Sequence, residues 1–166
     1  MSSDKKSEEI SQEFYLPFLG NALRVKASSE GVSEIYWLKN LPKKSQNLNP
    51  LQKKIKTQVD QFASGKAPLN LSIDWKNLEG TDFQKTVWKK MAKIPYGKTK
   101  SYGEIAQSLK KPGAARAVGT ACGKNPVLLA IPCHRVVGTN GLGGFSGGGL
   151  PVKRKLLSLE GVQAKG

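Results

Sequence analysis

Apolar and polar residues alternate in short runs in the first half of the chain, which is typical of strands in an antiparallel sheet. The runs are FYLPFLG, NALRVKAS and EIYWLKN, between residues 14 and 40. Gly20-Asn21 and Glu30-Gly31 lie between them and indicate turns. A small antiparallel sheet is therefore predicted here.

A helix is predicted in the following segment, LNPLQKKIKTQVDQFASG, because its apolar residues recur about every fourth position. These residues are Leu51, Ile55, Val59 and Phe62. Asn49 and Pro50 are typical of a helix start, and Gly65 is typical of a helix end. The run LNLSIDW, residues 69–75, then predicts another strand.

Short helices with clear start signals are predicted in the second half. Thr81 with Gln84, and Ser101 with Glu104, have the spacing of capping boxes. The second of these helices is followed by the turn Lys111-Pro112-Gly113 and by a small-residue helix over residues 114–124. This order is the outline of a helix-turn-helix, although two helices joined by a turn more often reflect simple packing.

The last third of the chain combines an apolar run, a glycine-rich loop and a terminal helix. VLLAI, residues 127–131, predicts a buried strand, and residues 141–149 form a loop that permits close backbone approach to a ligand. The loop lacks the GK[ST] ending of a P-loop. Pro151 is expected to begin a helix that ends at Glu160-Gly161.

These elements predict an α/β (α+β) protein with two parts. Residues 1–77 would form a small sheet-plus-helix domain, with a disordered tail at about residues 1–12. Residues 78–166 would form a mostly helical domain that contains the helix-turn-helix. No apolar run approaches the roughly 20 residues of a spanning helix, and the N-terminus does not resemble a secretory signal. We therefore expect an intracellular protein without a membrane partner.

Charge is concentrated in the second half. The net charge of the chain is +15, and residues 81–166 hold 15 Lys and Arg against 3 Asp and Glu, a net +12. Residues 1–80 hold 12 against 9, a net +3. Such asymmetry favours a polyanionic partner, most often nucleic acid, over a solvated basic surface.

The chain has two cysteines, Cys122 and Cys133, and a single histidine, His134. These are too few for a zinc cage or a disulfide framework, so no metal and no cofactor are expected. A free cysteine is usually a small buried hydrophobic residue, which suits Cys122. Cys133 differs because it leaves an apolar run through Pro132 and precedes the histidine.

A nucleophilic thiol needs a base that raises its thiolate fraction. Residues adjacent on a strand point to opposite sides, so contact between Cys133 and His134 requires a turn or a bridging water. A carboxylate would orient the imidazole. The basic half contains three acids, of which Asp82 and Glu104 begin helices, and Glu160 is left for this role.

The chain from about Phe83 to Gly161 resembles the O6-alkylguanine-DNA alkyltransferase family. The matching pieces, in the order of the family, are FQKTVW, IPYGKTKSYGEIA, ARAVGTA, KNP, IPCHRVV, FSGGG and LLSLEG. IPCHRV with an upstream ARAVG is a highly specific combination. The first half resembles the family only in its size and its expected sheet and helix.

The resemblance implies direct-reversal DNA repair, in which Cys133 takes the alkyl group from O6-alkylguanine, or O4-alkylthymine, once per molecule. His134 would take the thiol proton through a water, and Glu160 would hold His134. Asn125 would brace the turn of Cys133, and Tyr102 would supply a proton to the leaving guanine. The pocket would also contain Val136, Phe145 and Ser146.

The resemblance also implies binding of double-stranded DNA through the minor groove, by a monomer that flips the target nucleotide out of the helix. Arg116 would fill the vacated stack, and Tyr102 would crowd the phosphate. The remaining residues expected at the DNA are small or basic: Ala114, Ala115, Ala117, Gly119 and Arg135. Because its expected substrate is DNA, we expect the protein to act in the nucleus of a eukaryote, or in the cytoplasm and nucleoid of a prokaryote.

Two positions depart from the family pattern and affect the pocket. Phe145 replaces a Tyr of many members, which removes a hydroxyl that can bond O6, and Leu128 replaces a Pro of some members. Three other functions stay open: a non-catalytic reader of alkylated DNA, a helix-turn-helix regulator and a cysteine hydrolase. A reader would not be alkylated, a regulator would be unaffected by Cys133→Ala, and a hydrolase would turn over repeatedly.

Overall fold

The first half of the chain forms the antiparallel sheet that was predicted. The computed structural model describes residues 12–163, and its first strands are β1 (Gln12–Phe18), β2 (Asn21–Ser28) and β3 (Gly31–Leu38), in that order across the sheet. The predicted disordered tail lies outside the described residues, except that Gln12 begins β1. The chain has a mixed α/β fold, as expected.

Helix α1 (Pro50–Ala63) covers one face of this sheet. It begins as predicted, because the Asn49 side chain accepts a hydrogen bond from the Gln52 N–H while the Gln52 side chain accepts from the Asn49 N–H. Ile55, Val59 and Phe62 are buried as predicted, and Phe62 stacks on Phe18 of β1 with ring centroids 6.4 Å apart. Leu51 is exposed instead, and Gln52 of the capping box is buried in the first turn.

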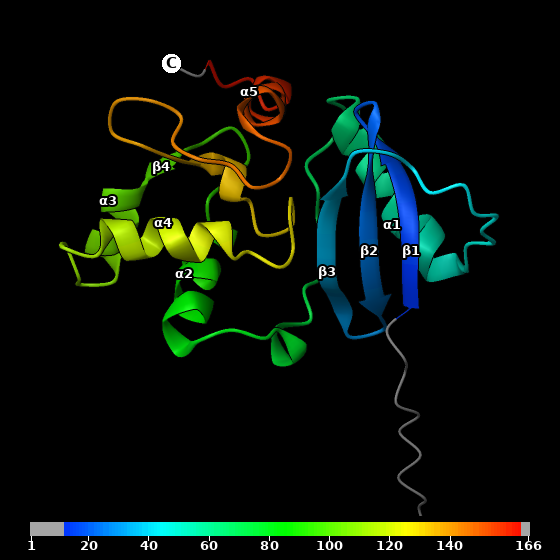
Figure 1. Cartoon of the computed structure of the whole chain (residues 1–166), viewed down its shortest axis with the longest axis horizontal. Coiled ribbons are helices and arrows are strands. Elements are labelled where there is room, and N and C mark those ends of the chain that lie inside the picture. Colours follow the sequence, from blue (N-terminus) through cyan, green and yellow to red (C-terminus); the bar gives the residue numbers. More distant parts are fainter. Residues whose placement is uncertain (1–11, 164–166) are drawn as a thin grey trace, which may run out of the picture.

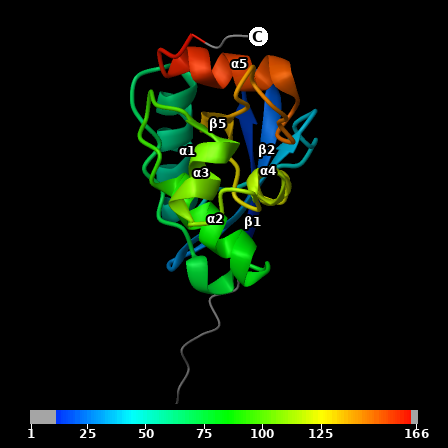
Figure 2. The same cartoon turned by 90° about the vertical axis from the view of Figure 1, so that its left-hand side faces the viewer.

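The second half is mostly helical, as Figure 1 shows. Its helices are α2 (Asp82–Ala92), α3 (Tyr102–Ser108), α4 (Ala115–Gly123) and α5 (Leu150–Leu159). Two short 3-10 helices are η1 (Trp75–Asn77) and η2 (Cys133–Arg135), and two short parallel strands are β4 (Lys100–Ser101) and β5 (Val136–Val137). In Figure 2, α5 lies across one end of the molecule.

The predicted helix starts of this half are confirmed. Thr81 caps α2 and Ser101 caps α3, each in a complete capping box. The turn after α3 leads into α4, and these two helices pack against one another and against α2. Trp88 of α2, which is buried, donates its indole N–H to the Ala121 carbonyl of α4 at 2.8 Å.

Two predicted strands are wrong. Within residues 69–75 only Ile73 bridges Val32, and the chain then turns into η1. Residues 127–131 form a tight buried turn, in which the Ile131 N–H donates to the Val127 carbonyl at 2.9 Å and Leu129 has a φ of 70°. The apolar residues of 127–131 are mostly buried, and those of 69–75 are partly buried against the core. Packing against the core does not by itself distinguish a strand from a turn.

Strand β3 connects the two halves. The Ile35 N–H donates to the Pro126 carbonyl at 3.0 Å, and the Leu128 N–H donates to the Ile35 carbonyl at 3.1 Å. One apolar cluster extends from β1 to α5. The division of the chain at residue 77 stays a prediction, and η1 ends at that residue. Within residues 12–163, no helix combines the length and the hydropathy needed to cross a membrane.

We expect Thr81→Ala to lower the free energy of unfolding by about 1 kcal/mol, because the Gln84 N–H loses its side-chain acceptor at the start of α2. Urea denaturation followed by circular dichroism measures this change. Thr86→Ala is the matched control, since Thr86 is an exposed threonine of the same helix that caps nothing. Equal destabilisation by both substitutions would contradict the capping role.

Candidate active site

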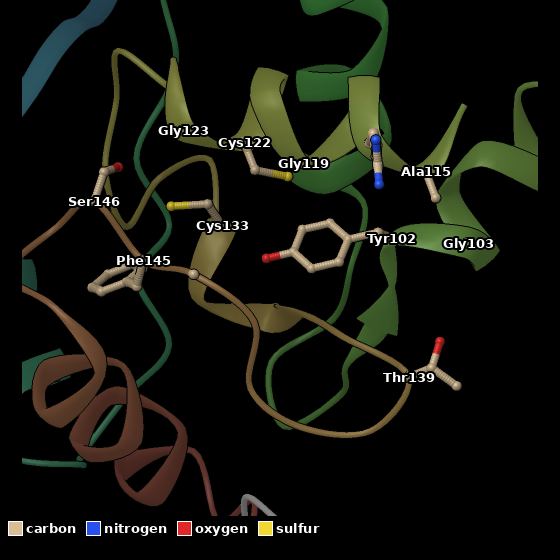
Figure 3. A pocket seen from close by; sticks show the side chains of 12 residues that line it. Tyr102, Gly103, Ala115, Gly119, Cys122, Gly123, Cys133, Thr139, Phe145 and Ser146 are labelled. Carbon is tan, nitrogen blue, oxygen red and sulfur yellow. The ribbon is translucent and has the colours of Figure 1, made fainter. Parts of the chain in front are cut away.

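Cys133 is the first residue of η2 and lines a cavity of about 720 Å³. A volume of this size is within the ~300–1,000 Å³ range of small-molecule sites. Figure 3 shows its Sγ directed to the side where Ser146 and Phe145 lie, with the Tyr102 hydroxyl directed towards Cys133. Cys133 is 5% exposed, so its thiol is available only from within the cavity.

The turn that precedes Cys133 is braced by Asn125. The Asn125 Nδ2 donates to the Ile131 carbonyl at 2.7 Å, and its Oδ1 accepts from the Val127 N–H at 2.9 Å. The Cys133 N–H also donates to the Ile131 carbonyl, at 2.8 Å. Asn125 is itself buried, and its position agrees with the role expected from the resemblance.

His134 follows Cys133 in η2 and is fully buried. Its Nε2 and the Glu160 Oε2 are 2.5 Å apart. Its Nδ1 is buried and has no hydrogen-bonding partner among residues 12–163. Burial lowers the pKa of His134 against the opposing effect of Glu160, so the imidazole is neutral at neutral pH.

Glu160 directly follows the last turn of α5 and accepts hydrogen bonds from three residues. Besides His134, the Arg135 Nε donates to its Oε1 at 2.7 Å, and the Gly97 N–H donates to the same oxygen at 3.0 Å. Burial alone would raise the pKa of this carboxyl. The hydrogen bonds from His134 and Arg135 outweigh that effect and lower the pKa to about 2.

The pKa of the Cys133 thiol lies above its ordinary value. Burial raises its pKa, and the amide of Asn125 and the charge of Lys153 oppose that effect only in part. Burial also raises the pKa of the half-buried Tyr102 hydroxyl. A resting thiol beside a phenol and a neutral imidazole can react only if a base removes its proton.

Tyr102 begins α3, and its ring lies between α4 and the glycine-rich loop. A Cβ at Gly119 would lie 3.8 Å from the ring, whereas a Cβ at Gly143 would come within 2.5 Å of the hydroxyl. Gly143 also has a φ of 70°, so the close approach of this loop requires glycine. On α4, the exposed Arg116 lines the cavity, together with Ala115 and Gly119.

Comparisons with known proteins agree with this geometry. Residues 82–162 match the family model of the 6-O-methylguanine DNA methyltransferase, DNA binding domain. A methylated-DNA–protein-cysteine methyltransferase of Mycobacterium tuberculosis is 52% identical over 111 residues, which are 64% of this chain and 65% of that protein. The inducible methyltransferase of Bacillus subtilis is 48% identical over 105 residues, 63% of this chain and 56% of that protein.

A solved structure extends the similarity to most of the chain. The crystal structure of Mycobacterium tuberculosis OGT in complex with DNA is 39% identical, covers 84% of this chain and 86% of that chain, and superposes with a TM-score of 0.70. The chain belongs to the O6-alkylguanine-DNA alkyltransferase family. The alignment with the curated M. tuberculosis relative spans just under two thirds of that relative's length.

The structure brings together most of the residues that the resemblance to the alkyltransferase family implied. One cavity is lined by Cys133, Tyr102, Phe145 and Ser146. Three further residues do not line it but are buried next to Cys133 or its turn: His134, Glu160 and Asn125. Val136 does not line this cavity. Its N–H donates to the Cys133 carbonyl, and its own carbonyl accepts from Lys153.

Of the residues expected at the DNA, Arg135 is not placed as predicted. Its guanidinium is bonded to both oxygens of Glu160 and to the Ile94 carbonyl, and the residue is only 8% exposed. A buried carboxylate without a cation nearby would be strongly destabilising. Arg135 therefore pairs with Glu160 in the interior and is not free to contact DNA at the surface. Ala117 is exposed on α4, and Ala114, which precedes α4, packs partly against the core.

Lys153 is a residue of this site that the sequence analysis missed. It is fully buried on α5, and its Nζ donates to three carbonyls of the segment that follows Cys133. Helical spacing could have shown it, because Lys153 precedes the buried Leu156 and Leu157 by three and four positions. Within residues 12–163, no group of three or more His, Cys, Asp or Glu side chains could hold a metal ion.

We expect Glu160→Gln to lower the free energy of unfolding at pH 7 by about 3 kcal/mol, because Arg135 would keep a buried charge without an anion. The wild-type carboxylate has a depressed pKa, so its stabilisation is present above the unfolded value near ~4.3 and is lost as the pH falls towards 2. Denaturant unfolding at several pH values should show a flatter acid limb in Glu160→Gln. The same slope in both proteins would contradict the ion pair.

Proposed function

We propose that this chain repairs alkylated DNA by moving the alkyl group of O6-alkylguanine, and of O4-alkylthymine, to Cys133 in a single turnover. The observation that carries the proposal is a cysteine at a cavity, next to a buried His134–Glu160 pair. The names of the alkyltransferase relatives support it. No cofactor takes part in the proposed reaction.

Activation of Cys133 begins at His134. A water at the unpaired Nδ1 would connect the imidazole to the thiol, and the proton would pass through it to His134. The resulting imidazolium is stabilised by the carboxylate of Glu160 at Nε2. Because the resting imidazole is neutral, it is ready to act as the base.

The thiolate then attacks the alkyl carbon, so a C–S bond forms and the bond between that carbon and O6 breaks. The electron pair leaves with guanine, which must gain a proton. Tyr102 is the donor we assign, because its hydroxyl is directed towards Cys133 and burial keeps it protonated. The thioether that remains has no route back to a thiolate, so each molecule reacts once.

The target atom lies inside the duplex, so the nucleotide must rotate out of the helix. Arg116 is exposed on α4 at the cavity, where its side chain can fill the vacated stack. Ala115, Ala117 and Gly119 have small side chains on the same helix and permit close approach to the minor groove. Phe145 and Ser146 would contact the flipped base within the cavity.

One chain supplies every residue in this scheme, so we propose that the monomer is the active form. Cys133 and His134 come from η2, Tyr102 from α3 and Arg116 from α4, while Glu160 follows α5. The basic second half provides the charge that attracts the phosphates, so DNA binding should weaken with salt.

Intact-protein mass spectrometry after mixing with a duplex that contains one O6-methylguanine tests the transfer. We expect a gain of one methyl, about 14 Da for replacement of the thiol hydrogen, that saturates at one per chain. Cys133→Ala should abolish it. Cys122→Ala is the matched control, because Cys122 lines the same cavity yet should be dispensable.

If the mass does not change, binding and turnover assays distinguish the other functions. Lesion-selective binding with no mass change would identify a non-catalytic reader of damaged DNA. Sequence-selective binding without lesion preference would indicate a regulator, and repeated turnover of an ester would indicate a hydrolase. All three functions predict no methyl gain at Cys133, and that unchanged mass is the result that would contradict the alkyl transfer.

We expect Arg116→Ala to slow methyl transfer from duplex DNA about tenfold or more, because unstacking the target base costs a few kcal/mol that the side chain no longer offsets. Reaction with the free base O6-methylguanine, which needs no flipping, should be unchanged. Quenched-flow or manual time courses of Cys133 methylation give both rates. An equal loss on both substrates would contradict a role in flipping.

A further inference from the structure

Lys153 is a buried cation without an anionic partner. Its ammonium donates to the carbonyls of Val136 at 2.6 Å, Leu142 at 2.5 Å and Gly144 at 2.9 Å. None of the ion pairs formed within residues 12–163 involves it. Glu160 follows the same helix, but its oxygens are bonded to His134, Arg135 and Gly97.

A buried ammonium that lacks a counter-charge is costly, and an apolar side chain of equal length would fill the same space. Burial lowers the pKa of Lys153 to about 8, so this side chain is charged in most molecules at neutral pH. Three carbonyls satisfy its three donors but do not neutralise that charge. The structure therefore holds one positive charge in the core. Lys153 donates to the Val136 carbonyl, and the Val136 N–H donates to the Cys133 carbonyl, so two hydrogen bonds link the ammonium to the main chain of the reactive cysteine.

The charges around Cys133 come from several elements. Glu160 and Arg135 carry opposite charges and cancel. His134 on η2, Tyr102 on α3 and Cys122 on α4 are neutral in the resting site. Lys153 on α5 therefore leaves this group one positive charge in excess, and its charge acts on Cys133.

The three carbonyls also have a common position in the chain. Val136, Leu142 and Gly144 belong to the segment that leaves η2 and reaches Phe145 and Ser146 at the cavity. Lys153 thus joins the segment after the nucleophile to the loop that lines the pocket. The same ammonium can set both the geometry and the charge of the site.

We propose that Lys153 is a positioning residue for alkyl transfer: it ties residues 136–144 in place and supplies the buried positive charge that favours the Cys133 thiolate. The inference rests on the proposed function, since the thiolate is the species that attacks the alkyl carbon. It assigns the lysine a role apart from the proton transfer through His134 and Glu160.

Reaction of Cys133 with iodoacetamide over a range of pH tests the charge without any DNA. The C–S bond forms, iodide leaves, and peptide mass mapping separates Cys133 from Cys122. We expect Lys153→Met to move the midpoint of the rate profile up by about one pH unit, or about tenfold in rate at a fixed pH. Lys153→Arg should restore most of the shift. Lys155→Met, an exposed lysine of the same helix, is the matched control and should leave the profile unchanged.

An unchanged midpoint in a folded Lys153→Met protein would overturn the proposal, even if methyl transfer from DNA were slower. Lys153→Gln replaces it if the methionine variant does not fold, because the amide can still donate to the loop carbonyls. The wild-type protein provides a further measurement. Its rate should rise less than tenfold per pH unit near pH 8, as Lys153 loses its charge, and a full tenfold rise would count against the proposal.

Failure of this inference is distinguishable from failure of the proposed function. The iodoacetamide rates do not depend on recognition of guanine or DNA. A wild-type protein that shows the Lys153 effect but accepts no methyl group from O6-methylguanine would refute the proposed function and retain the lysine's role at the thiol. Normal methyl transfer with no Lys153 effect would give the opposite result.

Discussion

The buried carboxylate of Glu160 is the group on which the arrangement of the site depends. It accepts hydrogen bonds from His134 and Arg135 of η2 and from the Gly97 N–H after α2. A carboxylate without these donors would be too costly to bury. The end of α5, the 3-10 turn of the nucleophile and the turn after α2 are therefore held together, and Tyr96 strengthens the junction by donating to the Leu159 carbonyl at 2.9 Å.

The first half of the chain supports the site although it supplies none of the proposed catalytic groups. Strand β3 holds residues 126–128 by two backbone hydrogen bonds. The neighbouring Asn125 donates to the Ile131 carbonyl and so connects this segment to the turn before Cys133. Strand β3 also contacts the glycine-rich loop through Trp37. The contact is so close that a Cβ at Gly148 would come within 2.8 Å of the Trp37 ring. The sheet therefore contacts both the segment that precedes Cys133 and the glycine-rich loop, which contributes Phe145 and Ser146 to the cavity.

The basic residues of the second half fall into two groups with different physical roles. Most lysines and Arg116 are exposed, where they can meet phosphates at little desolvation cost. Arg135 and Lys153 are buried, and their donors are satisfied by Glu160 and by main-chain carbonyls. The net charge of this half therefore overstates its surface charge, and part of it belongs to the chemistry of the site.

Local patterns in the sequence determined most elements of this protein. Alternation predicted β1 to β3, and capping residues at Asn49, Thr81 and Ser101 predicted three helix starts, because these signals depend on neighbours in the chain. The motif around Cys133 indicated the family. Tertiary structure alone decided that residues 127–131 form a turn, that Arg135 faces Glu160, and that Lys153 is buried without an acid. The reason is physical: whether a side chain is buried, and which partner satisfies its charge there, depends on segments far away in the sequence.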